Sequence, residues 1–187
     1  MKFAIFTCFI FLLSPSIQAQ FLVHARAGLI TFAEGKVFLE EEPFHYNGNS
    51  LEELKTGQQL RTTTGKVEVQ LGPSATLWMD TDSNLRMIDP DLRDTRIQID
   101  RGTILVEIVE ANKSNSIKFH LKDSIIEFKE IGIYLTSVDP PRLYVFEGKA
   151  EVSARNEKET VDKKKYLDFG QNLEQGGKRL RPGFQFQ

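Results

Sequence analysis

The feature that most constrains the fold of this sequence is an alternation of apolar and polar residues along most of the chain. Apolar residues occupy every second position in residues 66–71, 96–100 and 116–121. Successive side chains of a β-strand point to opposite faces of a sheet, so this spacing predicts strands with one buried face. Val, Ile, Phe and Tyr dominate residues 107–151, and these side chains pack well on a pleated surface. The pattern favours a chain built mainly from strands.

Further strands are expected in apolar segments that are separated by Gly, Pro, Asp and Asn. These segments are residues 29–32, 36–39, 76–79, 84–88, 103–109, 125–128, 131–135, 142–146, 149–152 and 165–169. Strands that recur every 8 to 14 residues or so, with turn residues between them, indicate an all-β fold. We expect a flattened β-roll or β-helix-like stack, or a sandwich, of short strands. The single helical candidate is residues 49–55, where Ser50 and Glu53 have the spacing of a capping box.

The two ends of the chain differ in composition from the part between them. Residues 1–19 combine a positive start, an apolar run and Ala19, which is typical of a secretory signal peptide. Residues 20–169 form the expected all-β domain, and residues 170–187, rich in Gly, Gln, Lys and Arg, are expected to be a flexible tail. We expect no transmembrane segment after signal cleavage.

Cysteine content bears on where this chain works. Its one cysteine, Cys8, lies in the signal segment, so the mature chain has no disulfide or thiolate metal site. An exported domain without disulfides fits the periplasm or exterior of a Gram-negative bacterium. The formal net charge of −2 argues against a nucleic-acid partner, because phosphate binding needs a surplus of Lys and Arg.

Motifs for catalysis or metal binding do not assemble in this sequence. The segment 80–84 resembles the start of a calcium loop, but Leu85 stands where the loop needs glycine, so a run of turn residues explains it better. Its three histidines have no metal-ligand spacing, and no nucleophile elbow or phosphate-binding loop is present. We therefore expect no enzyme activity, no cofactor and no metal.

Three aromatic residues are candidates for binding a partner. Trp78 lies between Leu77 and Met79, so its indole faces outward if those two face the core. By the same alternation Tyr144 and Phe146 share one face of their strand. Exposed aromatic side chains anchor partners, but a fold that covers both faces of its central strands would bury all three. Both interpretations remain open from the sequence.

Four segments, in order, resemble the FecR-type domain of the exported part of iron-dicitrate transport regulators. They are AGLITFAEGKV at 27–37; LKTGQQLRT at 54–62 with GKVEVQL at 65–71, LWMD at 77–80 and SNLRM at 83–87; IQIDRGTILVE at 97–107; and LYVFEGKAEV at 143–152. The chain looks especially like the short stand-alone exported FecR-like proteins of Acidobacteria. The resemblance implies an all-β domain outside the cytoplasm that contacts another protein.

The expected function is therefore that of an exported, non-catalytic interaction or sensing module. Its partner would be an envelope or outer-membrane protein, bound through sheet faces or an unpaired strand edge. The alternative is binding of an envelope polysaccharide, in which Trp78 stacks on sugar rings while Asp80 or Asn84 bonds hydroxyl groups. A role in sigma-factor signalling is not favoured, because this sequence shows neither the cytoplasmic nor the transmembrane part of the regulators.

Overall fold

The described part of the chain folds into a β-sandwich. The computed structural model describes residues 26–48, 51–110, 115–155, 157–169 and 174–176, and these contain strands and turns but no helix. One sheet has eight strands in the order β1-β5-β6-β9-β12-β13-β16-β17, and the other has nine in the order β15-β14-β11-β10-β8-β7-β4-β2-β3. The all-β class expected from the alternation is confirmed, in its sandwich form.

The strands are short, and most match segments expected from the sequence. Their bounds are β1 Leu29–Glu34, β2 Val37–Leu39, β3 Glu42–Phe44, β4 Gln59–Thr62, β5 Lys66–Gly72, β6 Ala75–Met79, β7 Asn84–Asp89, β8 Thr95–Arg101, β9 Thr103–Ile108, β10 Ile117–Leu121, β11 Ser124–Phe128, β12 Gly132–Val138, β13 Pro141–Glu147, β14 Lys149–Ala154, β15 Glu157–Asp162, β16 Lys165–Asp168 and β17 Glu174–Gly176.

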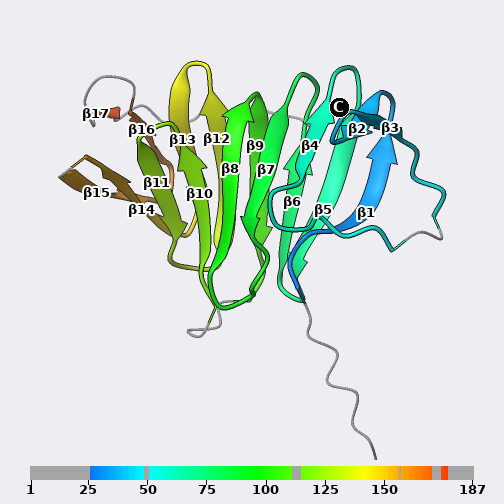
Figure 1. Ribbon diagram of the computed structural model, residues 1–187. Coiled ribbons are helices and arrows are strands. Elements are labelled where there is room, and N and C mark those ends of the chain that lie inside the picture. Colours follow the sequence, from blue (N-terminus) through cyan, green and yellow to red (C-terminus); the bar gives the residue numbers. More distant parts are fainter. Residues whose placement is uncertain (1–25, 49–50, 111–114, 156, 170–173, 177–187) are drawn as a thin grey trace, which may run out of the picture.

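The chain advances along the sandwich from one end to the other. Figure 1 shows β1, β2 and β3 at one end, in blue, and β14 to β17 at the opposite end, in brown and red. Successive hairpins alternate between the two sheets. The hairpin β5-β6 lies in the eight-stranded sheet and β7-β8 in the nine-stranded sheet; later in the chain, β12-β13 lies in the eight-stranded sheet and β14-β15 in the nine-stranded sheet. Neighbouring strands are antiparallel except β8 and β10, which pair in parallel.

The core lies between the sheets and runs the length of the described domain. Buried apolar side chains from both sheets form one continuous cluster. Phe119, Phe128 and Tyr134 pack in series, with ring centroids 4.9 and 4.7 Å apart. The alternation seen in the sequence therefore turns one set of side chains inward on every long strand, while the opposite set faces outward.

The helical candidate at residues 49–55 is wrong for the part that the structure describes, residues 51–55. This segment is extended along the edge of β1, where Ile30 N donates to Glu52 O at 2.8 Å and Leu54 N donates to Gly28 O at 2.9 Å. Leu54 is buried in the core cluster. Backbone pairing with β1 and burial of one leucine thus override the local capping signal. Ser50 lies outside the described residues.

The expected tail shows one departure within the described residues. Glu174–Gly176 forms β17, which pairs antiparallel with β16. The other residues of segment 170–187 lie outside the described residues, as does the expected signal segment 1–19.

Residues of the family-like motifs meet where the two sheets are joined. Thr62 in β4 accepts a hydrogen bond from Ser83 N at 3.0 Å through its Oγ1, and Ser83 Oγ accepts one from Thr103 N at 3.2 Å. Gly102 has a φ of +88°, and a Cβ there would lie 2.6 Å from the Cα of Ser83. These motif residues therefore hold the fold together, which explains why the motifs are informative about architecture.

Candidate functional site: an aromatic outer face

Outward-facing residues of the eight-stranded sheet form a row that crosses the strands. Each strand from β1 to β16 contributes one residue, and each of these residues is paired with the next one on the neighbouring strand. In order they are Phe32, Glu68, Trp78, Leu105, Leu135, Tyr144 and Tyr166. Side chains at such opposed positions contact one another on the same face of a sheet. The aromatic face is defined here as Phe32, Trp78, Leu105, Ile133, Tyr144 and Tyr166. None of these six is buried in the core, whereas Leu135, between Leu105 and Tyr144 in the row, is only 4% exposed.

Trp78 faces outward because the residues on either side of it face inward. Leu77 and Met79 are buried in the core, whereas Trp78 is half-buried on the opposite side of β6. Its Nε1 donates a hydrogen bond to Glu68 Oε2 at 3.0 Å, and Thr31 Oγ1 donates to Glu68 Oε1 at 2.7 Å. Glu68 therefore fixes the orientation of the indole, and the polar N–H of the ring is already satisfied.

The β1 end of the aromatic face is hollowed. A cavity of about 470 Å³ is lined by apolar atoms of Phe32, Trp78, Leu105 and Ile133. Lys66, Glu68 and Glu107 also line it. Phe32 is 43% exposed, which is high for a large aromatic side chain. The hollow thus offers apolar surface to a partner beside a few charged groups.

The β16 end of the face carries a stack of two tyrosines and an arginine. The rings of Tyr144 and Tyr166 are 5.7 Å apart, and Arg142 Cζ lies 5.0 Å from the centroid of Tyr166. Arg142 Nη1 donates to Tyr144 Oη at 2.8 Å, and its Nη2 donates to Asp168 Oδ2 at 2.9 Å. The hydrogen bond to Asp168, followed by that to Tyr144, raises the pKa of Arg142 above its ordinary value. The cluster is therefore ordered before any partner arrives.

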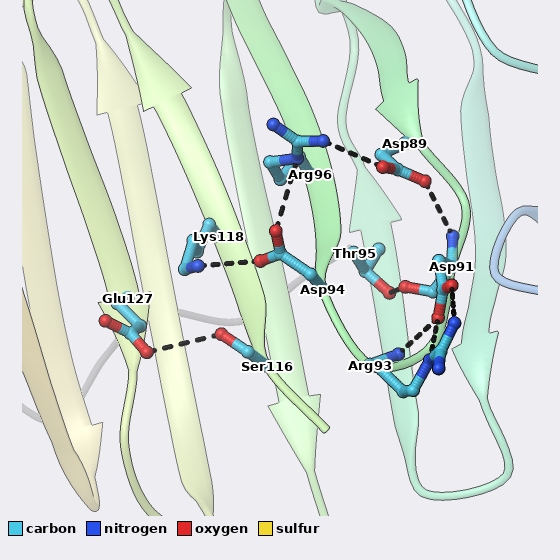
Figure 2. Close-up of polar contacts among 9 residues, drawn as sticks. All are labelled: Asp89, Asp91, Arg93, Asp94, Thr95, Arg96, Ser116, Lys118 and Glu127. Atoms are coloured by element: carbon cyan, nitrogen blue, oxygen red, sulfur yellow. Dashed lines mark hydrogen bonds and ion pairs between the residues drawn. The ribbon is translucent and has the colours of Figure 1, made fainter. Parts of the chain in front are cut away.

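The outer face of the nine-stranded sheet has a different character. Figure 2 shows Arg96 between Asp89 and Asp94, with Lys118 on the other oxygen of Asp94. The Arg96 Nη2 to Asp89 Oδ2 distance is 2.8 Å, and the Lys118 Nζ to Asp94 Oδ1 distance is 2.6 Å. The hydrogen bond from Arg96 lowers the pKa of Asp89. This part of the outer face therefore carries paired charges, in contrast to the aromatic face.

Two of the three aromatic candidates, Trp78 and Tyr144, lie on the outer side of the eight-stranded sheet. Tyr144 lies in the row, and Phe146, also half-buried, lies where the pairing of β12 and β13 shifts register. Of the residues considered for binding sugar hydroxyls, Asn84 lies in β7 of the other sheet and does not share a face with Trp78. Asp80 Oδ1 accepts a hydrogen bond from Thr81 N at 2.7 Å, as expected for a turn residue.

Sequence reasoning missed Phe32, Leu105, Ile133 and Tyr166. Alternation alone places Leu105 and Tyr166 outward, but it does not say which strands are neighbours. Phe32 depends in addition on a register irregularity in β1 between Ile30 and Phe32. Such an irregularity changes which face a side chain occupies, and nothing in the local residues marks it.

The described residues show no grouping of three His, Cys, Asp or Glu side chains able to hold a metal ion. Nor does the described part of the chain contain a helix of the length and apolarity needed to span a membrane. His120 lies on the charged outer face in β10, and His24 lies outside the described residues.

Comparison with known proteins finds similarity in fold. No protein-family model matches the chain, and no curated protein matches it. Two crystal structures of a candidate anti-sigma factor from Parabacteroides distasonis are similar, with TM-scores of 0.54 and 0.53 and identities of 10% and 9%. Each match covers 65% of this chain and 59% of that chain, so less than two thirds of the relative is spanned. The likeness shows the fold alone, and it is consistent with the FecR-like architecture that the motifs resemble.

Proposed function

We propose that this chain is an exported, non-catalytic interaction module that contacts another protein of the cell envelope through the aromatic face. The observation that carries this proposal is the aromatic face, in which six strands of the eight-stranded sheet each place one apolar or aromatic side chain outside the core. Contiguous exposed apolar surface on a soluble domain marks interaction sites, and Trp and Tyr are the residues that most often dominate binding energy.

Two further observations support a protein as the partner. Leu105 and Ile133 add aliphatic surface between the aromatic rings, which suits apolar side chains better than hydroxyl groups. The name of the fold relatives, anti-sigma factor, describes a protein that acts on another protein. Action on a sigma factor is a property of those relatives and is not proposed for this chain.

Contact through a sheet face is favoured over contact through a strand edge. In the nine-stranded sheet, the edge strand β15 carries four charged residues and the edge strand β3 contains Pro43, two devices that discourage pairing with another strand. In the eight-stranded sheet, residues 52–54 cover the start of the β1 edge. The aromatic face has no comparable cover among the described residues.

The experiment compares two matched surface variants of the exported chain. Phe32 and Ile125 are 43% and 38% exposed, and they lie on the outer faces of the two different sheets. We expect Phe32→Ser to weaken recovery of a reproducible envelope partner at least tenfold, and Ile125→Ser to leave it unchanged, because burying one large apolar side chain is worth about 1.5–3 kcal/mol. Equal recovery with both variants would contradict the proposed contact surface.

Binding of an envelope polysaccharide is the second candidate. Tyr144 and Tyr166 lie on neighbouring strands, and Trp78 lies three strands from Tyr144 on the same face, so a sugar chain laid across strands about 4.8 Å apart would meet two adjacent rings and then a third. Binding on a glycan array that is lost in Trp78→Ala and retained in Ile125→Ser would favour this alternative.

A further inference from the structure

A second hollow, called the end hollow here, opens between the two sheets at the ends of several central strands. It lies where β5 turns into β6, next to the ends of β9 and β11 and the start of β10. Its volume of about 320 Å³ is at the lower limit of the size of small-molecule sites. It shares no lining residue with the hollow beside Trp78, so it is independent of the aromatic face.

The floor of this end hollow is made of core side chains that remain partly accessible. Ala75, Ile108, Ile117 and Phe128 are 6%, 8%, 9% and 7% exposed, whereas Phe119, deeper between the sheets, is 0% exposed. Ala75 and Ile108 come from the eight-stranded sheet, and Ile117 and Phe128 come from the nine-stranded sheet. An apolar group that entered here would therefore contact both sheets and replace water on apolar surface.

The rim of the hollow is acidic. Three of its lining residues are carboxylates, Glu110, Glu127 and Glu130, and one is a cation, Lys129. Ser74 Oγ donates to Glu110 Oε2 at 3.2 Å, and Ser116 Oγ donates to Glu127 Oε1 at 3.2 Å, the pair drawn in Figure 2. These hydroxyl groups hold the carboxylates beside the opening, and each carboxylate keeps further acceptor positions for a ligand.

The cations near the rim act on two of its three carboxylates, Glu127 and Glu130. Lys129 Nζ lies 2.6 Å from Glu127 Oε2, and Lys149, which does not line the hollow, reaches Glu130 Oε1 at 3.2 Å. Although burial works to raise the pKa of Glu127, hydrogen bonds from Lys129 and Ser116 lower it below its ordinary value. Glu110 has no cation among the ion pairs of the described residues. Lys118 adds a further positive charge near Glu127, so the uncompensated negative charge of the rim lies at Glu110, and that side of the rim attracts a positive group and repels an anion.

From this combination of an apolar floor and an acidic rim, we propose that the end hollow binds a small organic cation, with its apolar body between the sheets and its ammonium group beside Glu110. The ligand class is that of primary alkyl or aryl amines small enough for the hollow. Neither the aromatic face nor its partner enters this proposal.

Three probes of equal chain length test it on the folded chain by titration calorimetry. Hexylammonium, hexanol and hexanoate share one apolar body and differ in the charge of the head group. We expect hexylammonium to bind most tightly, hexanol more weakly and hexanoate not measurably, with the affinity for hexylammonium falling as salt is raised. Binding of hexanoate as tight as that of hexylammonium, or no binding of hexylammonium, would overturn the proposal.

Two variants locate the binding. Glu110→Gln removes one rim charge and should weaken hexylammonium roughly two- to fivefold, while hexanol is unaffected. Glu147→Gln removes an exposed carboxylate that lines neither hollow, so it is the matched control and should change the affinity for neither ligand. Ala75→Leu fills the floor and should abolish binding of both ligands, with retention of the fold checked by circular dichroism. Unchanged binding in folded Ala75→Leu would place the ligand elsewhere and refute the inference.

Discussion

The hydroxyl group of Tyr134 gives the clearest quantitative test of the packing described here. Tyr134 is fully buried in β12, and its Oη donates to Glu130 O at 2.8 Å and accepts from Lys149 N at 3.1 Å. Tyr134→Phe removes both hydrogen bonds without creating a large cavity. Because each buried bond contributes about 0.5–1.5 kcal/mol, the loss of unfolding free energy should be about 1–3 kcal/mol.

Denaturant unfolding measures this loss, with thermal unfolding as a second assay. We expect a lower midpoint at an unchanged m-value, and a fall in Tm of about 2–4 °C for each kcal/mol. Tyr144→Phe is the matched control. Its hydroxyl group lies on the outer face and accepts from Arg142, which is also held by Asp168, so that variant should lose less than about 0.5 kcal/mol. Equal losses in the two variants would refute the reasoning.

Three further predictions concern a turn, the aromatic face and pH. Gly148→Ala should lower the free energy of unfolding by at least about 1 kcal/mol more than Gly57→Ala does. Both glycines have positive φ, but only at Gly148 would an added Cβ collide with neighbouring atoms, and denaturant midpoints measure the difference. Glu68→Ala should raise the acrylamide quenching of Trp78, the only tryptophan, with little change in unfolding midpoint; unchanged quenching would mean that Glu68 does not hold the indole. Burial, with the nearby positive charges, lowers the pKa of His120 in the folded state. Because the unfolded chain then binds a proton more readily, the free energy of unfolding should be highest above the unfolded pKa of about 6.5 and should fall as pH drops below it. His120→Gln should therefore flatten the dependence of unfolding free energy on pH between 8 and 5, and an identical dependence in the variant would contradict this assignment.

The fold class followed from local residues because alternation acts within each strand. Segments such as Lys66–Gly72 and Ile117–Leu121 carry their apolar residues on one side, and the structure buries that side. Strands without this contrast were missed. Glu157–Asp162 has a single buried side chain, Val161, and Glu42–Phe44 has none. These are edge strands, where one side of the backbone pairs and the polar side chains face water.

The candidate site was predictable only in part. The outward direction of Trp78 and Tyr144 followed from the inward direction of their neighbours. Their place in a common row did not, because it depends on β9 and β12 lying between β6 and β13. Such neighbour relations come from strand pairing between segments far apart in sequence, about which a local pattern carries no information. The contact of Glu68 with Trp78 depends on the same pairing, between β5 and β6.

Photo-crosslinking from the aromatic face tests the central claim most directly. A photoreactive phenylalanine in place of Trp78 would sit beside the hollow of the aromatic face, and the same residue in place of Ile125 would lie on the other sheet as the control. In intact cells we expect one protein of the envelope to be crosslinked from position 78 and not from position 125. Crosslinking of the same protein from position 125 alone would contradict the assignment of the aromatic face as the contact surface.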